Sequence, residues 1–279
     1  MQGLGSYAVI LKTHNSSKYI HKAIASLEQQ TIKPKQIIII DSASKDASDL
    51  NQYKNLTRYN LTIIEEDIGF CKGNNLGYRM VEPEIDFVLF LNPDAFPESH
   101  VIEQCLHYMN HYENHHIGAV TGALHRFDID QNRPTGYIDS TGIFQTWYGR
   151  WYDRGQGDPI TQQQQDPESV PALCGAFMFC RKQALDQVLI GGDQVFDESF
   201  FMYKEDIDLS LRMRREGWDL KLLPQLIVFH CRGWQRRALV PQKYKVLSAR
   251  NECVIHWKKK SPTLLYSLLK YLAVRFLRV

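Results

Sequence analysis

The feature that most constrains the fold of this chain is a series of short, continuous apolar runs, each ending in polar or acidic residues. The runs cover residues 7–11, 36–40, 61–64 and 87–91, and apolar residues recur at helical spacing between them, as in 19–27. Strands that are apolar throughout and alternate with helices predict a parallel sheet covered on both faces. Ligands of such sheets bind beyond the carboxyl ends of the strands, so the polar residues after each run are candidate site residues.

The second half of the chain is less regular. Between about 125 and 172 no sustained period is present, which predicts a long functional loop or an insertion rather than a second domain. We expect a strand within 172–180, then helices at about 182–189 and 205–216. From residue 262 onward the sequence is a separate amphipathic segment.

Composition excludes several classes of protein. With 279 residues, 44% of them hydrophobic and 23% charged, the chain is neither a disordered polyelectrolyte nor a polytopic membrane protein. The six cysteines are scattered, with no CxxC pair, and this spacing favours buried, reduced thiols over a metal finger or a disulfide framework. The first residues are not typical of a signal peptide, so we expect a cytoplasmic protein.

Two isolated residues are candidate metal ligands. Asp94 follows the run at 87–91, and Pro93 must end that strand and present the Asp94 carboxylate at the sheet edge. Such a carboxylate can hold a hard divalent cation, although for this tripeptide taken alone a simple turn is the commoner explanation. His230 ends a further apolar run, where a metal ligand or a core histidine is possible.

Glu205 and Asp206 are candidates for acid–base chemistry. They begin the helix expected at 205–216, directly after an aromatic stretch, and a helix N-terminus favours carboxylates. Adjacent carboxylates near apolar rings tend to have separated pKa values, which suits one of them to act as a base. The alternative is ordinary acidic capping of an amphipathic helix, and Asp208 fits that description.

Taken together, these pieces resemble a known family. The chain is similar to family 2 glycosyltransferases of the GT-A fold, and within them to the bacterial rhamnosyltransferase-like branch. The resemblance covers about residues 7–255 and is carried, in family order, by segments 9–16, 39–46, 68–77, 91–94, 174–178, 196–209 and 215–218, the last leading to His230. It implies an α/β fold with a mostly parallel, Rossmann-like sheet flanked by helices.

The resemblance also assigns roles to residues. Asp206 would be the catalytic base, supported by Glu205, while Asp94 and His230 would hold Mg²⁺ or Mn²⁺ on the donor diphosphate. The metal-binding triplet begins with Asn92 where many relatives have Asp, which leaves the metal one carboxylate fewer. The residues that would bind the nucleotide are Thr13, Asn15, Asp41, Gly69, Asn74, Asn75 and Asn92.

The activity implied is inverting transfer of a sugar from a nucleotide-diphosphate donor, dTDP-rhamnose or a UDP-sugar, to a hydroxyl of a glycan or lipid-linked acceptor in bacterial surface polysaccharide synthesis. We accordingly expect a catalytic domain over 1–231, with a nucleotide-binding half at 1–124 and an acceptor half at 125–231, and a helical extension over 232–279. A catalytically silent nucleotide-sugar binder or assembly scaffold is the alternative. A nucleotidyltransferase or dehydrogenase is disfavoured because no glycine-rich phosphate loop follows the first run.

Charge is distributed unevenly along the chain. Residues 232–279 hold 12 lysines and arginines and one acidic residue, Glu252, although the net charge of the whole chain is only +2. On a helical wheel one apolar face is opposed by Ser267, Lys270 and Arg278; that face comprises Leu265, Leu268, Leu269, Leu272 and Phe276. This pattern predicts an interfacial helix on an anionic membrane, hence a peripheral protein on the inner face of the cytoplasmic membrane. The alternative is that the leucine face docks on the catalytic domain; nucleic acid is not expected as a partner, because no recognition motif accompanies the charge.

Overall fold

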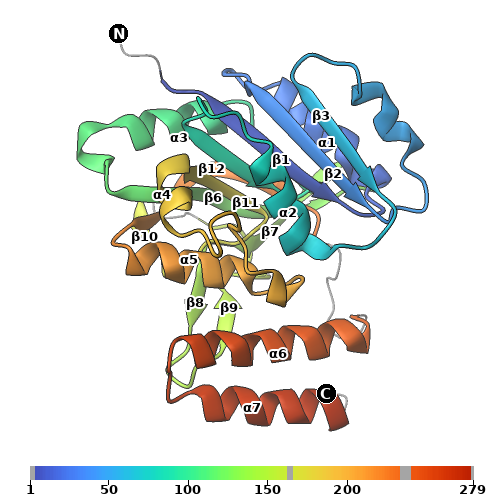
Figure 1. Ribbon diagram of the computed structural model, residues 1–279. Helices are drawn as coiled ribbons and strands as arrows, with labels where there is room; N and C mark the ends of the chain where they lie inside the picture. Colours follow the sequence, from blue (N-terminus) through green and yellow to red (C-terminus); the bar gives the residue numbers. More distant parts are fainter. Residues whose placement is uncertain (1–3, 162–165, 233–239, 278–279) are drawn as a thin grey trace.

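The computed structural model describes residues 4–161, 166–232 and 240–277. In this described part, a mixed ten-stranded sheet forms the centre of the protein, with helices on both of its faces (Figure 1). The strands that form one continuous path run in the order β10-β12-β6-β11-β4-β1-β2-β3, while β5 pairs with β12 and β7 with β6. The predicted α/β class is therefore confirmed.

The first half of the sheet follows the sequence prediction closely. The four apolar runs are β1 (Tyr7–Thr13), β2 (Gln36–Ser42), β3 (Tyr59–Ile64) and β4 (Phe87–Leu91), separated by α1 (Ser17–Glu28), the 3-10 helix η1 (Ser48–Tyr53) and α2 (Gly69–Arg79). The pairs β1–β2, β1–β4 and β2–β3 are all parallel. Every residue of β1, β2 and β4 is buried, as expected for strands covered on both faces.

The second half of the sheet is mixed in direction. It contains β5 (Ala95–Pro97), β6 (Ile117–Asp128), β11 (Phe177–Arg181) and β12 (Asp219–His230), with α3 (Val101–Asn110), the 3-10 helix η2 (Tyr112–Asn114), α4 (Lys182–Gln187), the 3-10 helix η3 (Glu198–Phe200) and α5 (Glu205–Arg215) between and after them. Strand β11 is antiparallel to both of its neighbours, β4 and β6. The two helices predicted in this part are confirmed as α4 and α5, and Leu209 and Met213 are buried on one side of α5, as predicted.

Of the two alternatives for the segment 125–172, the long loop is wrong, because the segment contains short strands. The end of β6 lies here, followed by β7 (Arg133–Ser140), the two-stranded sheet of β8 (Ile143–Gln145) and β9 (Trp151–Asp153), and β10 (Glu168–Ser169). These strands are short, and most of β7 is exposed, so no continuous apolar run marks them. Their turns use glycines in the left-handed region, Gly142 with φ of 99° and Gly149 with φ of 104°.

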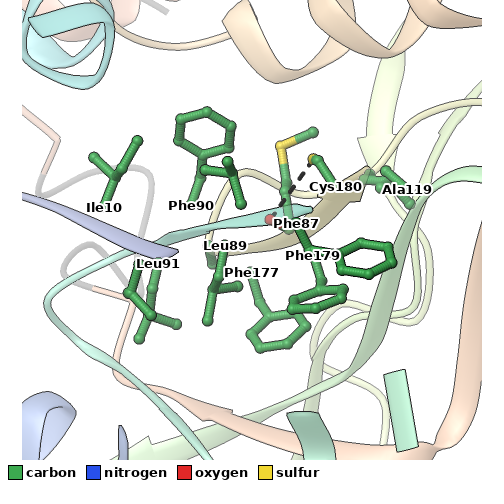
Figure 2. Packing of buried hydrophobic residues seen from close by; sticks show 14 of the residues in the cluster. Ile10, Phe87, Leu89, Phe90, Leu91, Ala119, Phe177, Phe179 and Cys180 are labelled. Carbon is green, nitrogen blue, oxygen red and sulfur yellow. Dashed lines mark hydrogen bonds between the residues drawn. The ribbon is translucent and has the colours of Figure 1, made fainter. Parts of the chain in front are cut away.

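The core beneath the site is built from aromatic and branched side chains of β4 and its neighbours. In Figure 2, Phe87, Leu89 and Leu91 of β4 lie on one side of the sheet and Phe90 on the other, as the two-residue period of a strand requires. Phe87 stacks on Phe179 of β11, with ring centroids 5.4 Å apart. Full burial of a side chain of this size contributes about 1.5–3 kcal/mol. The core therefore fixes the end of β4, from which Asp94 follows.

The carboxyl-terminal part forms a helical hairpin below the sheet in Figure 1. Its helices are α6 (Gln242–Lys258) and α7 (Leu264–Leu272), and α7 continues as a short π-helix, η5 (Ala273–Leu277). Contacts cross the predicted domain boundary at residue 231: Lys258 of α6 pairs with Asp197 and Asp208, at 2.6 Å each. Asp208 is thus a buried structural residue rather than a solvated cap.

The leucine face of α7 points to solvent. Leu265 is 67% exposed and Leu269 59%, whereas Ser267, on the other side of the helix, is fully buried. The alternative in which the leucine face docks on the catalytic domain is therefore wrong; Arg278 lies outside the described residues. Within the described part of the chain, no helix has both the length and the hydropathy needed to cross a membrane.

Candidate active site

The ends of β1 and β2 bring Thr13 and Asp41 together. The two residues are partners in the parallel register, and both are almost fully buried. Oδ2 of Asp41 accepts a hydrogen bond of 2.6 Å from the Ser44 hydroxyl. Oδ1 of Asp41 is buried and has no hydrogen-bond partner among the described residues. A buried carboxylate oxygen normally has a partner, so this atom is a candidate to accept a hydrogen bond from a ligand.

Asn15 joins the loop after β1 to the loop after β2. Its backbone has a φ of 50°, its N–H donates to Ser44 Oγ at 2.6 Å, and its Oδ1 accepts from the backbone N–H of Lys45 at 2.9 Å. His14 adds a 2.7 Å contact between its Nδ1 and the carbonyl oxygen of Ser42. The two loops form one rigid rim beside Thr13 and Asp41.

Helix α2 begins at Gly69, which lies against the aromatic segment before α5. Gly69 has a φ of +73°, and a Cβ atom there would come within 2.5 Å of the Phe201 ring. The backbone N–H groups of Phe70 and Cys71 donate to the carbonyl oxygen of Phe201 at 2.8 and 3.1 Å. Only glycine allows this close approach, so Gly69 fixes the position of the segment that leads to Glu205.

The two asparagines of α2 make contacts within the protein. Asn75 is fully buried; its amide donates to the carbonyl oxygen of Phe196 at 2.8 Å, and its Oδ1 accepts from the Phe196 N–H at 2.9 Å. Asn74 donates to the carbonyl oxygen of Phe70 at 3.0 Å. Asn75 therefore holds α2 to the loop at Phe196, and both polar atoms of its amide make contacts within the protein. Its contact with a nucleotide stays a prediction.

The residues predicted to hold a metal lie next to each other. The turn at Asn92 ends β4, and β5 pairs with β12 so that Ala95 is opposite His230. This pairing places Nε2 of His230 3.3 Å from Oδ1 of Asp94. Burial opposes the charge of both groups. The attraction to His230 outweighs burial at Asp94 and lowers its pKa, while Asp94 together with Asp139 raises the pKa of His230 to about 10.

A second carboxylate, absent from the sequence prediction, holds the other nitrogen of His230. Oδ2 of Asp139, on β7, lies 2.7 Å from Nδ1 of His230, and the Asp139 side chain is fully buried. Burial raises the pKa of Asp139, but the hydrogen bond from His230 and the nearby arginines outweigh this, so its pKa is lowered. Because an ionised carboxylate can only accept hydrogen bonds, Nδ1 of His230 is the donor.

Arg232 extends this cluster toward the other carboxylates. Its Nε lies 2.8 Å from Oδ1 of Asp139, and its Nη2 lies 2.8 Å from Oδ2 of Asp153 on β9. Asp139 and Asp153 both belong to the segment in which no strand was predicted. Their sequence gave no signal because neither follows an apolar run; only the pairing of β7 with β6 brings Asp139 under His230.

Glu205 and Asp206 lie at the first turn of α5, as predicted. Oε2 of Glu205 is buried and has no hydrogen-bond partner among the described residues, whereas Asp206 accepts hydrogen bonds from the N–H groups of Gly175 at 3.0 Å and Ile207 at 2.8 Å. Burial raises both pKa values, and the neighbouring Asp206 helps to raise that of Glu205 to about 8. Both groups therefore favour their protonated forms more than a carboxyl group in water does, while the backbone donors of Asp206, which Glu205 Oε2 lacks, favour a charge on Asp206.

The loop before α5 is strained and is braced by α6. Phe201, Tyr203 and Lys204 all have positive φ, between 61° and 72°. Each such residue costs of order 1–3 kcal/mol unless the surroundings hold it in place. Nδ2 of the buried Asn251 lies 2.9 Å from the carbonyl oxygens of Phe200, Met202 and Tyr203. Asn251 could not be found from the sequence, because it lies on a helix with no amphipathic pattern.

One short segment joins the two halves of the site. The N–H of Asn92 donates to the carbonyl oxygen of Ala176 at 3.0 Å, and the N–H of the preceding Gly175 donates to Asp206. The turn that presents Asp94 and the helix that presents Asp206 are thus tied to consecutive residues. The contacts of Asn92 and Asn74 with a nucleotide stay a prediction.

The residues present fit a divalent cation that is shared with a ligand. Among the described residues there is no group of three or more His, Cys, Asp or Glu side chains that forms a protein-only metal site. Asp94 would supply one oxygen and His230 one nitrogen once the cation displaces the proton on Nε2, while Asp139 holds the other ring nitrogen, as carboxylates often do for metal-binding histidines. Mg²⁺ and Mn²⁺ commonly take one or two protein ligands and complete their shell with water and phosphate oxygens.

Comparison with known proteins agrees with this geometry. Residues 8–189 match the family described as Glycosyl transferase family 2. The chain is 24% identical over 236 residues to an N-acetylglucosaminyl-diphospho-decaprenol L-rhamnosyltransferase of Mycobacterium tuberculosis (strain CDC 1551 / Oshkosh), covering 80% of this chain and 75% of that protein. It is also 24% identical over 246 residues to the rhamnosyltransferase WbbL of Escherichia coli (strain K12), covering 85% and 88%.

Solved structures show the same fold. GalNAc-T7, crystallised with UDP, GalNAc and Mn²⁺, superposes with a TM-score of 0.67 at 14% identity over 88% of this chain, which spans 48% of the length of GalNAc-T7. At that identity the likeness concerns the fold alone. The family match covers well over half of the chain and includes Thr13, Asp41 and Asp94. The chain therefore belongs to glycosyl transferase family 2, and it is a glycosyltransferase.

Proposed function

We propose that this enzyme transfers rhamnose, with inversion, from a nucleotide-diphosphate donor to a hydroxyl of a lipid-linked glycan. The observation that carries the proposal is the joining of two carboxylate centres through consecutive residues, Asp206 to Gly175 and Asn92 to Ala176. One centre suits a donor diphosphate and the other suits a general base. Both curated relatives described above are named rhamnosyltransferases, which supports the choice of sugar.

Asp41 supports a pyrimidine donor. Its Oδ1 is a buried acceptor without a partner among the described residues, at the end of β2. The N3–H group of thymine or uracil is a donor that can satisfy it, whereas N3 of cytosine carries no proton. Thr13 and Asn15 form the adjoining rim. A thymine or uracil base therefore fits this acceptor, and the choice over guanine, whose N1–H could also donate to it, rests on the similarity to rhamnosyltransferases.

Asp206 is proposed as the base. The acceptor hydroxyl must lose a proton as its oxygen attacks the anomeric carbon, and the C–O bond to the diphosphate breaks on the opposite side. The proton goes to the Asp206 carboxylate, and the bonding electrons leave with the nucleoside diphosphate. A single displacement of this kind inverts the anomeric configuration. Glu205, protonated beside Asp206, adds no second negative charge next to the base.

Asp94 and His230 are proposed to hold Mg²⁺ or Mn²⁺ against the donor. Bound there, the cation would offset the charge that develops on the leaving diphosphate. Nε2 of His230 faces Asp94 because Asp139 holds Nδ1, so both ligand atoms point to one place. The Mn²⁺ in the GalNAc-T7 structure agrees with a metal in this fold.

The acceptor and the location follow from the relatives and from the basic extension. The mycobacterial relative is named for a decaprenol-linked N-acetylglucosaminyl diphosphate, so a polyprenyl diphosphate-linked sugar is the acceptor class that we propose. Residues 232–279, treated as an extension of a catalytic domain over 1–231, would keep the enzyme on the inner face of the cytoplasmic membrane, where such an acceptor is embedded. The charge of this segment supports the assignment.

A thermal-shift series with Mn²⁺ tests the donor. We expect dTDP-rhamnose to raise the melting temperature more than UDP-sugars and GDP-sugars, and Asp41→Ala to abolish the difference between pyrimidine and purine donors. Asp94→Ala should remove the effect of Mn²⁺ on donor affinity, measured by calorimetry with and without the metal. Stabilisation by GDP-sugars alone would contradict the assignment of Asp41.

Transfer to a polyprenyl diphosphate-linked N-acetylglucosamine, followed by mass spectrometry, tests the reaction. A product heavier by one deoxyhexose, with the opposite anomeric configuration to the donor, is expected. The alternative function, a silent sugar-nucleotide binder, predicts donor binding with neither transfer nor slow donor hydrolysis.

A further inference from the structure

Helix α7 and the adjoining η5 carry an exposed apolar face. The exposed fractions are 67% for Leu265, 43% for Leu268, 59% for Leu269, 47% for Leu272, 69% for Phe276 and 73% for Leu277. No other element of the described chain has so many large apolar side chains exposed to solvent. Contiguous exposed apolar surface of this kind marks an interaction site.

The tertiary structure holds this face outward. Helix α7 and η5 pack on α6 through the opposite side, where Ser267 of α7 is fully buried and Val274 of η5 is 2% exposed. Nζ of Lys270 reaches the buried Oε2 of Glu252 on α6 at 2.5 Å. A helix that served the core would bury its leucines and expose its lysine, so the packing of α7 is the reverse of that arrangement.

The β8–β9 hairpin adds a tryptophan and an arginine beside α7. Tyr148 of this hairpin packs on Tyr266 of α7, with ring centroids 5.1 Å apart. The neighbouring Trp147 is 92% exposed, and Arg150 is exposed next to it. Figure 1 shows the hairpin reaching down to the end of the α6–α7 hairpin. Tryptophan side chains favour the boundary between water and lipid.

Charge identifies the kind of surface that fits this face. Arg150, Lys260 and Arg275 are exposed around it, and the segment 264–277 contains no acidic residue. The single acidic residue in 232–279, Glu252, is buried against Lys270. An apolar face bordered by cations, with no exposed carboxylate among them, matches a bilayer rich in anionic lipid.

We propose that α7, η5 and the β8–β9 tip form one docking surface that lies in the headgroup region of an anionic membrane. At nine residues, α7 is too short to span a bilayer, so it would lie along the interface. A second copy of the chain is a poorer occupant, because the same cations would face each other across a two-fold axis. The proposal deepens the proposed function, since it places the lipid-linked acceptor beside the site, but its observations do not depend on the reaction.

The docking surface is also tied to the catalytic loop. Asn251 and Glu252 are consecutive residues of α6; the first braces the loop before Glu205 and the second holds α7. A membrane bound to the leucine face would therefore have a fixed position relative to Asp206. This rigid link is what an enzyme needs to meet a substrate that is embedded in lipid.

Co-sedimentation of the full chain with vesicles tests the proposal without any substrate. We expect binding to vesicles that contain phosphatidylglycerol, weaker binding to pure phosphatidylcholine, and a decrease as salt rises. The double variant Leu268→Gln and Leu272→Gln should reduce binding at least tenfold. The control is Leu56→Gln, which makes the same chemical change at a side chain that is 47% exposed near the other end of the sheet. Unchanged binding of the double variant would overturn the proposal.

Two further measurements separate this proposal from its competitors. If the leucine face joins two copies, light scattering will show a dimer of the parent that the double variant loses, and the membrane assignment will be wrong. Hydrolysis of the nucleotide-sugar donor in the absence of acceptor reports on the reaction alone. If the double variant keeps donor hydrolysis but loses vesicle binding, both proposals are supported. If the parent binds vesicles but does not hydrolyse the donor, the proposed function is wrong and the docking surface is still supported.

Discussion

Oδ2 of Asp139 lies 2.7 Å from Nδ1 of His230, and this contact determines which nitrogen of the histidine faces Asp94. The two residues are 91 positions apart and belong to β7 and β12, which both pair with β6. The histidine is therefore fixed before any ligand arrives. A side chain that is already oriented loses less entropy when it binds a metal.

Asp139→Asn is expected to weaken Mn²⁺ binding by about 10–100-fold, the usual effect of removing a carboxylate behind a metal-binding histidine. Asparagine keeps the size but removes the charge that holds the Nδ1 proton in place. Electron paramagnetic resonance of free Mn²⁺, titrated in the presence of nucleoside diphosphate, measures this affinity directly. Asp193→Asn, at an exposed carboxylate that pairs with Arg79, is the control and should have no effect. Equal Mn²⁺ affinity of Asp139→Asn and the parent would exclude the positioning role.

Asp206→Asn is expected to reduce kcat by about 10²–10⁴-fold, the typical contribution of a general base. Donor affinity should stay within a few-fold of the parent, because the proposed base acts on the acceptor hydroxyl and not on the nucleotide. Asp208→Asn offers a comparison on the same helix: its contacts with Arg212 and Lys258 are structural, so it should lower the melting temperature and leave kcat nearly intact. Turnover of Asp206→Asn close to the parent value would remove it from the base role.

Glu205→Gln is expected to change how stability depends on pH. The pKa of Glu205 is raised from 4.5 to about 8 in the folded protein, so between these values the folded state binds the extra proton. The stabilising contribution is fully present below about pH 4.5 and is lost as the pH rises through about 8, with a slope of at most about 1.4 kcal/mol per pH unit. Glutamine removes this loss, and the variant should gain stability relative to the parent at pH 8.5 but not at pH 4.5.

Urea unfolding at the two pH values measures the difference between parent and Glu205→Gln. The exposed Glu216, at the other end of α5, provides the control substitution Glu216→Gln. A stability difference that is the same at pH 4.5 and pH 8.5 would show that the pKa of Glu205 is not raised in the folded protein, contrary to the assignment.

Asn251→Ala is expected to lower both stability and turnover. Its amide lies 2.9 Å from three carbonyl oxygens of the strained loop before α5, and leaving buried polar groups without partners costs about 1–3 kcal/mol. The looser loop would let Glu205 and Asp206 move, so kcat should fall more than KM changes. Asn110→Ala, which removes an exposed asparagine with contacts to Leu4 and Leu106, tests the same change away from the site. A variant that loses stability but keeps full kcat would assign Asn251 to folding alone.

Several parts of the fold could be predicted from the sequence because they depend on local pattern. Strands β1, β2 and β4 are buried on both faces, so their apolar runs are unbroken and easy to recognise. Asp94, Glu205 and Asp206 could be found because each follows a strand or opens a helix. The segment 125–172 could not be read in this way, since its strands are short, partly exposed and separated by glycine turns.

The sequence by itself determined the class of fold, the positions of the first four strands along the chain and the family, because these follow from hydrophobic period and from motifs in register. Only the tertiary structure decided what surrounds the site residues. Asp139, Arg232 and Asn251 act on His230 and on the loop before α5 through contacts between distant segments, and such contacts leave no local period. The orientation of α7 was also decided by the tertiary structure. Its sequence shows an apolar face, but this face is turned to solvent because the opposite side packs on α6, through the buried Ser267 and the Glu252–Lys270 pair.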